Sequence, residues 1–151
     1  MNIIIEEMKE LRVVYIRNVG PYGASNYETM KKIKTWAKDN DLVNDELIIL
    51  GIAEDNPAVT QPEDCRYDAC AVIGENYHIN DSIVSEGRIA GGKYAVFKVE
   101  HTAEAVQQAW SSIFEEISNH GCNMDSTRPI IERYKMDMVM NGYCEICVPI
   151  K

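Results

Sequence analysis

Six short runs of hydrophobic and β-branched residues recur along the chain, and each has the length of a β-strand. The runs lie at residues 11–17, 46–53, 67–74, 92–99, 129–136 and 143–150. Val, Ile and Tyr dominate several of them, which is typical of strands. Turn-forming residues separate the runs, including a Gly-Pro pair at 20–21 and a Gly-Gly pair at 91–92. The pattern therefore predicts six strands.

Between the first two runs, apolar residues recur at helical spacing. The predicted apolar face of this helix consists of Tyr27, Met30, Ile33 and Ala37. Ser25 and Glu28 have the spacing of a capping box, so we expect the helix to begin there and to end at residues 40–41.

A second helix is predicted between the fourth and fifth runs. Thr102 is a favourable N-cap, and Gly121 is a typical stop after a helix that extends to about residue 120. Its predicted apolar face consists of Val106, Trp110, Ile113 and Ile117.

The predicted order is strand, helix, strand, strand, followed by the same order again. We therefore predict an α+β domain over residues 1–151, built from two βαββ repeats at about 1–75 and 86–151. Each repeat is too small to bury its sheet face well alone. We expect their strands to join in one antiparallel sheet with both helices on one face. A groove between the helices at the pseudo-twofold axis is then the expected place for a small ligand.

The charge balance narrows the possible partners. The 151 residues include 15 basic and 24 acidic ones, for a formal net charge of −9. This sign opposes direct nucleic-acid binding and attracts cations. No apolar run approaches the ~20 residues that a membrane span needs, and the acidic start does not resemble a signal peptide. We expect a cytoplasmic protein that binds neither nucleic acid nor membrane.

The cysteines are expected to be reduced thiols that serve as small core residues. They are Cys65, Cys70, Cys122, Cys144 and Cys147. Cys144 and Cys147 form a CxxC within the last predicted strand, where positions three apart point to opposite faces of the sheet. A closed zinc site would also need four ligands. We therefore predict neither a metal site nor a cofactor.

Both faces of the predicted strand at 129–136 carry a charged residue. Ile130, Glu132 and Tyr134 share one face, and Ile131 and Arg133 share the other. Two interpretations are open. Glu132 faces solvent while Ile131 packs in the core, which the residues alone favour. Alternatively, Glu132 faces the helices, where an unpaired carboxylate would favour a cationic partner or a shifted pKa.

The aromatic residues are mostly amphipathic, with eight Tyr and two Trp against two Phe. Such side chains combine an apolar body with a polar group, which suits amphipathic ligands. Aromatic rings beside a carboxylate would form a cation-binding cage. Trp110, however, lies on the apolar stripe of its helix, where such residues usually belong to the core.

Six motifs carry a resemblance to a known family. They are VVYIRNVGPY at 13–22, EDNP at 54–57, CRYD at 65–68, GGKYAV at 91–96, PIIERY at 129–134 and EICVPI at 145–150. In order and spacing they resemble the GyrI-like family, the small-molecule-binding domains of AraC-type and related regulators. The resemblance spans essentially the whole chain and implies the tandem βαββ fold.

The resemblance also implies a site for bulky, often cationic, aromatic compounds. Glu132 matches the glutamate of the PxxExY motif at the pocket floor, which pairs with the positive charge of the ligand. The other positions implied to line the pocket are Tyr22, His101, Trp110, Tyr134 and Tyr143. At His101 this sequence departs from the aromatic residue that family members carry.

We therefore expect a binding protein for cationic or amphipathic aromatic compounds, acting as a sensor or a sink. Many relatives attach a helix-turn-helix DNA reader, for which these 151 residues leave no room, so a separate regulator is an expected partner. One alternative is a hydrolase of strained cyclopropane-containing genotoxins with Glu132 as general base. Another is a protein-binding module similar to the relative that inhibits DNA gyrase. Both a monomer and a homodimer are compatible with the sequence.

Overall fold

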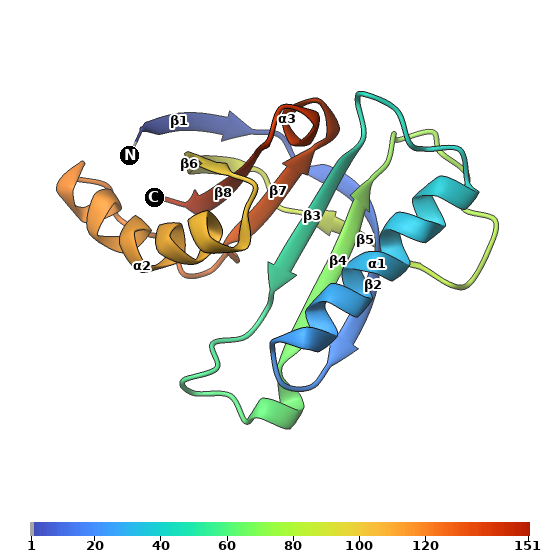
Figure 1. Cartoon of the computed structure of the whole chain (residues 1–151), viewed down its shortest axis with the longest axis horizontal. Coiled ribbons are helices and arrows are strands. Elements are labelled where there is room, and N and C mark those ends of the chain that lie inside the picture. Colours follow the sequence, from blue (N-terminus) through green and yellow to red (C-terminus); the bar gives the residue numbers. More distant parts are fainter. Residues whose placement is uncertain (1) are drawn as a thin grey trace.

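The protein forms one curled sheet of eight antiparallel strands with three α-helices, in the computed structural model that describes residues 2–151 (Figure 1). The strands are β1 (Ile3–Met8), β2 (Leu11–Val19), β3 (Ile48–Ala53), β4 (Arg66–Val72), β5 (Ser85–Ile89), β6 (Gly92–Glu100), β7 (Ile131–Lys135) and β8 (Tyr143–Pro149). The helices are α1 (Ala24–Asp39), α2 (Ala103–Asn119) and α3 (Met136–Met140), with one 3-10 turn at Pro62–Asp64. The predicted α+β class is confirmed.

The strand order across the sheet is β1-β6-β8-β7-β3-β4-β2-β5. All six predicted strands are present, and β7 and β3 lie side by side at the centre. The sequence analysis missed the two edge strands, β1 and β5, and the short helix α3. Edge strands are hard to recognise because they carry charged and polar residues, as in the Ser-Glu-Gly-Arg-Ile of β5. The order is symmetric about the central pair, although the internal repeat itself stays a prediction.

Both long helices cover the same face of the sheet. One core cluster lies under α1 and includes Ile33, Trp36 and Ile49, and a second lies under α2 and includes Ile113. Tyr134 of β7 packs against both clusters. The two helices therefore enclose the centre of the sheet from either side, as Figure 1 shows.

The opposite face of the sheet is also buried at its centre. A third cluster there contains Leu50, Tyr94, Val96 and Ile131. The curl of the sheet brings strands from both halves together on this side, so that apolar residues are buried on both faces. The residues of β7 consequently face a packed environment in both directions.

The start of α1 differs from the prediction. Gly23 precedes the helix at φ 141°, a value that favours glycine, and no side chain caps the first turn. Instead of accepting from a helix amide, the hydroxyl of Ser25 donates to the backbone oxygen of Pro21 at 3.0 Å. The capping-box prediction with Glu28 is therefore wrong. Tyr27 is also 73% exposed, whereas Trp36, absent from the predicted apolar face, is 4% exposed.

The predictions for α2 are confirmed. The hydroxyl of Thr102 accepts a 3.1 Å hydrogen bond from the amide of Ala105, and Gly121 adopts φ 70° after the helix. The predicted apolar face packs on the cluster under α2, with Ile113 and Ile117 buried and Trp110 half-buried at its margin. No helix in residues 2–151 combines the length and the apolar character that a membrane span requires.

The two cysteines of the CxxC point in opposite directions, as predicted. Cys144 belongs to the cluster under α2, and Cys147 belongs to the cluster on the other face. All five thiols are free, and only Cys122 is more than slightly exposed.

Candidate functional site

Glu132 lies near the middle of the sheet on the face that carries the helices. Its neighbours across the sheet are Gly51 of β3 and Ile146 of β8. Tyr134, two positions along β7, shares its face because strand side chains alternate. The second interpretation of this strand therefore holds: the carboxylate faces the region between the two helix-covered cores.

Gly51 makes room for another tyrosine beside Glu132. A Cβ atom at Gly51 would lie 2.6 Å from the hydroxyl oxygen of Tyr67 and 3.3 Å from Cε of Met30. The side chain of Tyr67, from β4, thus reaches over β3 at the residue paired with Glu132. Because Gly51 has no side chain, Tyr67 of β4 can contribute to a site on β7.

Tyr134 is the hydrogen-bond partner of Glu132. Its hydroxyl donates to Oε2 of Glu132 over 2.7 Å, a length typical of a bond to a charged acceptor. The ring of His101, at the start of α2, lies with its centroid 5.4 Å from that of Tyr134 at an angle of 51°. His101 is exposed, so it stands at the outer side of this group.

Burial dominates the electrostatics of the site. It raises the pKa of Glu132, and the hydrogen bond from Tyr134 opposes that rise. Burial and the nearby charge of Glu132 also raise the pKa values of Tyr67 and Tyr134, and they raise the pKa of Cys144 to about 11. Within residues 2–151, no Lys or Arg forms an ion pair with Glu132. The carboxylate therefore lacks a countercharge from this part of the chain.

The opposite face of β7 provides a contrast. Arg133 is 3% exposed, yet its guanidinium bonds to Glu145 at 2.8 Å and to both carboxylate oxygens of Glu6 at 2.9 and 3.0 Å. A buried charge with such partners is satisfied. Because Arg133 is held on that face, Glu132 is directed to the helix face.

The remaining predicted site residues do not gather around Glu132. Tyr143 alternates with Cys144 and so belongs to the other face of the sheet, where Lys98 lies 4.2 Å from its ring centroid. Trp110 packs at the margin of the core under α2. The hydroxyl of Tyr22 bonds to the backbone near the 3-10 turn at Pro62–Asp64, where the backbone oxygens of Asp55 and Arg66 lie at 3.2 and 2.8 Å.

Sequence reasoning overlooked Tyr67, Gly51 and Cys144 as neighbours of Glu132. Tyr67 lies within the CRYD motif that supported the family resemblance, so a signal existed without a role attached to it. Gly51 interrupts an otherwise apolar strand, which often marks a close approach by another group.

Two hollows in the structure lie away from Glu132. The larger one, of about 500 Å³, is beside α1, and the smaller one, of about 200 Å³, is on the opposite face of the sheet near Arg17 and Asp68. Neither is the groove that we predicted between the helices. The side chains of Tyr67 and Met30 occupy the space above Gly51, the residue that pairs with Glu132. Residues 2–151 contain no group of three His, Cys, Asp or Glu side chains arranged to hold a metal ion.

Comparisons with known proteins agree with this fold. The model of the GyrI-like small molecule binding domain matches residues 1–151. The "SPbeta prophage-derived putative transcriptional regulator YosT" of Bacillus subtilis is 45% identical over 152 residues, covering all of both chains. "DNA gyrase inhibitor 1" of Dickeya dadantii is 23% identical, over 85% of this chain and 84% of its own. A solved structure of SAV2435 bound to tetraphenylphosphonium superposes with a TM-score of 0.63 at 18% identity, covering 100% of this chain and 94% of that one. This chain belongs to the GyrI-like family of small-molecule-binding domains.

Proposed function

We propose that this protein binds bulky organic cations with aromatic bodies, and that Glu132 supplies the countercharge. The observation that carries the proposal is a half-buried carboxylate, bonded to Tyr134 but without an ion-pair partner in residues 2–151. An unpaired charge withdrawn from water is costly, and a cation placed beside it reduces that cost. The tetraphenylphosphonium ligand of SAV2435 belongs to this chemical class.

The surroundings of Glu132 suit the apolar body of such a ligand. The rings of Tyr134 and Tyr67 come from β7 and β4, the two strands that flank β3, and their faces attract a cation that is removed from water. Met30 lies over Gly51 together with Tyr67, and a methionine side chain adapts its shape at small cost. We expect the ligand to displace Met30 and open the space that this side chain now fills.

The experiment compares probes of equal shape and opposite charge. Tetraphenylphosphonium and tetraphenylborate are titrated by calorimetry into the wild type, Glu132→Gln and Glu115→Gln. Glu115 is an exposed residue of α2 and controls for the loss of one negative charge elsewhere. We expect the cation alone to bind the wild type, with at least tenfold weaker binding in Glu132→Gln and unchanged binding in Glu115→Gln. Equal affinity of the cation for the wild type and Glu132→Gln would overturn the proposed role.

The same geometry supports a second candidate, hydrolysis of a strained ring. A carboxylate of raised pKa beside a tyrosine hydroxyl is a suitable general base for water. Glu132 would accept a proton from the water, whose oxygen would bond to a ring carbon. The breaking C–C bond would leave its electron pair on the electron-withdrawing group of the substrate, which takes up a proton from Tyr134. Product analysis by mass spectrometry on a cyclopropane-containing alkylating compound tests this candidate: a product heavier by one water, absent with Glu132→Gln, supports it.

A further inference from the structure

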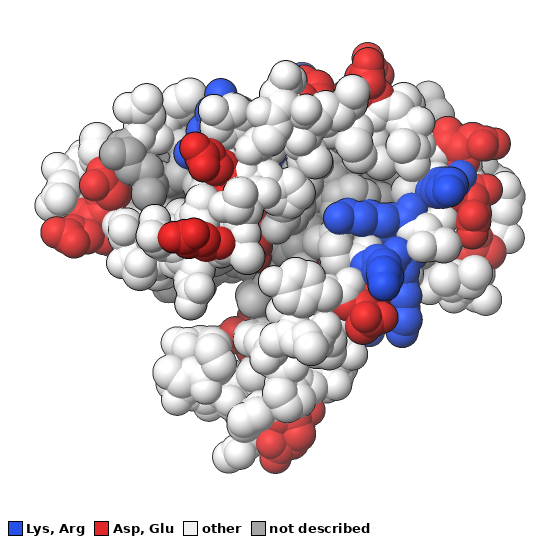
Figure 2. All heavy atoms as spheres, in the orientation of Figure 1, with Lys and Arg blue, Asp and Glu red and all other residues white. Residues whose placement is uncertain are grey.

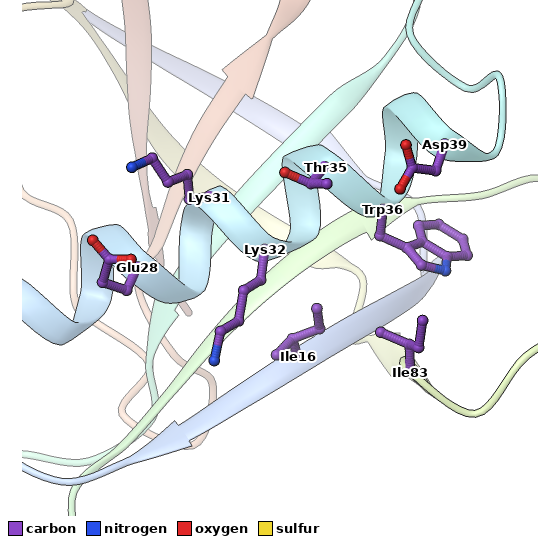
Figure 3. Close-up of a pocket in the computed structure, with 8 residues that line it drawn as sticks. All are labelled: Ile16, Glu28, Lys31, Lys32, Thr35, Trp36, Asp39 and Ile83. Carbon is purple, nitrogen blue, oxygen red and sulfur yellow. The ribbon is translucent and has the colours of Figure 1, made fainter.

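The larger of the two hollows lies beside α1, and neither Glu132 nor Tyr134 lines it. Figure 3 shows it between α1, β2 and the segment that precedes β5. Its volume of about 500 Å³ lies within the range of sites for small organic molecules. No part of the proposed function uses it.

Apolar side chains form the floor of this hollow. Ile16 projects from β2, Trp36 from α1, and Ile83 from the segment that precedes β5, all toward the same space (Figure 3). Ile83 is 70% exposed, so this apolar side chain is accessible to a ligand in the hollow.

Asp81 holds this floor in place. One of its carboxylate oxygens accepts a 3.0 Å hydrogen bond from Nε1 of Trp36, and the other accepts a 3.1 Å bond from the amide of Ile83. Asp81 therefore fixes the position of the Trp36 indole relative to the backbone of Ile83. A preformed apolar surface costs less ordering when a ligand binds.

Lys32 supplies a cation at the edge of the floor. Its side chain extends from α1 past Ile16, as Figure 3 shows, and it forms no ion pair within residues 2–151. The helix carries four lysines against Glu28 and Asp39, whereas the whole chain has a net charge of −9. Figure 2 shows basic side chains gathered over α1, with acidic side chains beside them and scattered over the rest of this face.

We infer that the hollow beside α1 is a second binding site, which takes a small organic anion with a flat apolar body, such as an aromatic carboxylate or sulfonate. The body lies on Ile16 and Ile83, beside the largely buried Trp36, and the anionic group pairs with Lys32. Glu28 and Asp39, at the two ends of the hollow, confine the anion to its middle. The site has the opposite charge preference to that proposed for Glu132, so the two sites select different ligands.

The test uses 8-anilinonaphthalene-1-sulfonate and its neutral counterpart 1-anilinonaphthalene, titrated by fluorescence. We expect the sulfonate to bind the folded wild type, and Lys32→Gln to weaken it at least fivefold. Lys34→Gln removes the same charge from the same helix but outside the hollow, and it is expected to leave the affinity within twofold. The neutral probe should not distinguish the two variants, and Ile83→Asn should weaken both probes.

Independence from the Glu132 site is part of the same experiment. We expect neither Glu132→Gln nor an excess of tetraphenylphosphonium to change sulfonate binding. The inference would be overturned if Lys32→Gln and Lys34→Gln weakened sulfonate binding equally. It would also be overturned if Glu132→Gln changed the sulfonate affinity and Lys32→Gln did not. Absence of sulfonate binding to the wild type would do the same. None of these results depends on whether a cation binds at Glu132.

Discussion

The hydroxyl of Tyr134 is bonded to the carboxylate of Glu132 over 2.7 Å, and both side chains project from the same face of one strand. This relation is local, because two positions on a strand are enough to create it. Its environment is not local, since the charge of Glu132 also raises the pKa values of Tyr67 on β4 and Cys144 on β8. The pair therefore combines a bond encoded within one strand with a burial that the whole sheet imposes.

Glu132→Gln is expected to make the protein more stable at neutral pH. Because burial raises the folded-state pKa of Glu132 above 4.5, the wild type loses stability as pH rises from 4.5 through that pKa. Glutamine keeps an acceptor for Tyr134 without the charge. Thermal unfolding should show a higher Tm for the variant at pH 7, by roughly 2–4 °C for each kcal/mol gained. The gain should shrink toward pH 4.5; a lower Tm than the wild type at pH 7 would contradict the burial of an unpaired charge.

Tyr134→Phe should raise the pKa of Glu132 further, because the hydroxyl is the group that stabilises the charged carboxylate. A hydrogen bond to a charged group contributes about 1.5–3 kcal/mol, so a loss of about that size is expected above the pKa of Glu132. NMR titration of the Glu132 carboxyl gives the pKa directly. In a double-mutant cycle with Glu132→Gln, additive effects of the two substitutions on stability would show that the two groups are not coupled.

Gly51→Ala should destabilise the fold, because its Cβ would lie 2.6 Å from the hydroxyl oxygen of Tyr67. Overpacking of this kind typically costs about 1–3 kcal/mol. Urea unfolding measures the loss in the wild-type and Tyr67→Phe backgrounds. The penalty should be smaller with Tyr67→Phe, which removes the oxygen while the ring carbons stay at ordinary distance. The same penalty in both backgrounds would mean that the hydroxyl does not occupy the space over Gly51.

Arg133→Ala should cost about 3 kcal/mol, since it removes the guanidinium partner of the buried Glu145 and leaves that carboxylate only Lys135, at 3.6 Å. Arg88→Ala is the matched control: Arg88 also bonds to two glutamates, Glu10 and Glu75, but all three are exposed, and such pairs contribute about 0–1 kcal/mol. Denaturant unfolding compares the two. Equal losses would show that burial of the Arg133 cluster has no energetic consequence.

The pH dependence of the Arg133 cluster provides a separate check. Arg133 lowers the pKa of Glu6 below 4.5, so the stabilisation by this pair is present above pH 4.5 and is lost as pH falls through the lowered value. The acid limb of the stability curve should therefore be less steep in Glu6→Gln than in the wild type.

Local patterns account for most of the predicted elements. The spacing of apolar residues and the hydroxyl of Thr102 predicted α2 correctly, because a helix stripe and an N-cap depend on a few neighbouring residues. The same reasoning failed at Ser25 and Tyr27. There the tertiary structure turned Trp36 inward and bonded it to Asp81, a residue 45 positions away.

The sequence by itself determined that Glu132 and Tyr134 share a face and that Cys144 and Cys147 do not, because strand alternation is a property of the backbone. Only the tertiary structure decided which face meets the helices, since the curl of the sheet buries both. It also decided that Tyr67 crosses Gly51 to reach Glu132, while Tyr143 is carried to the other side. Pairing β3 with β7 joins residues about 80 positions apart, and no local pattern encodes which side chains then meet.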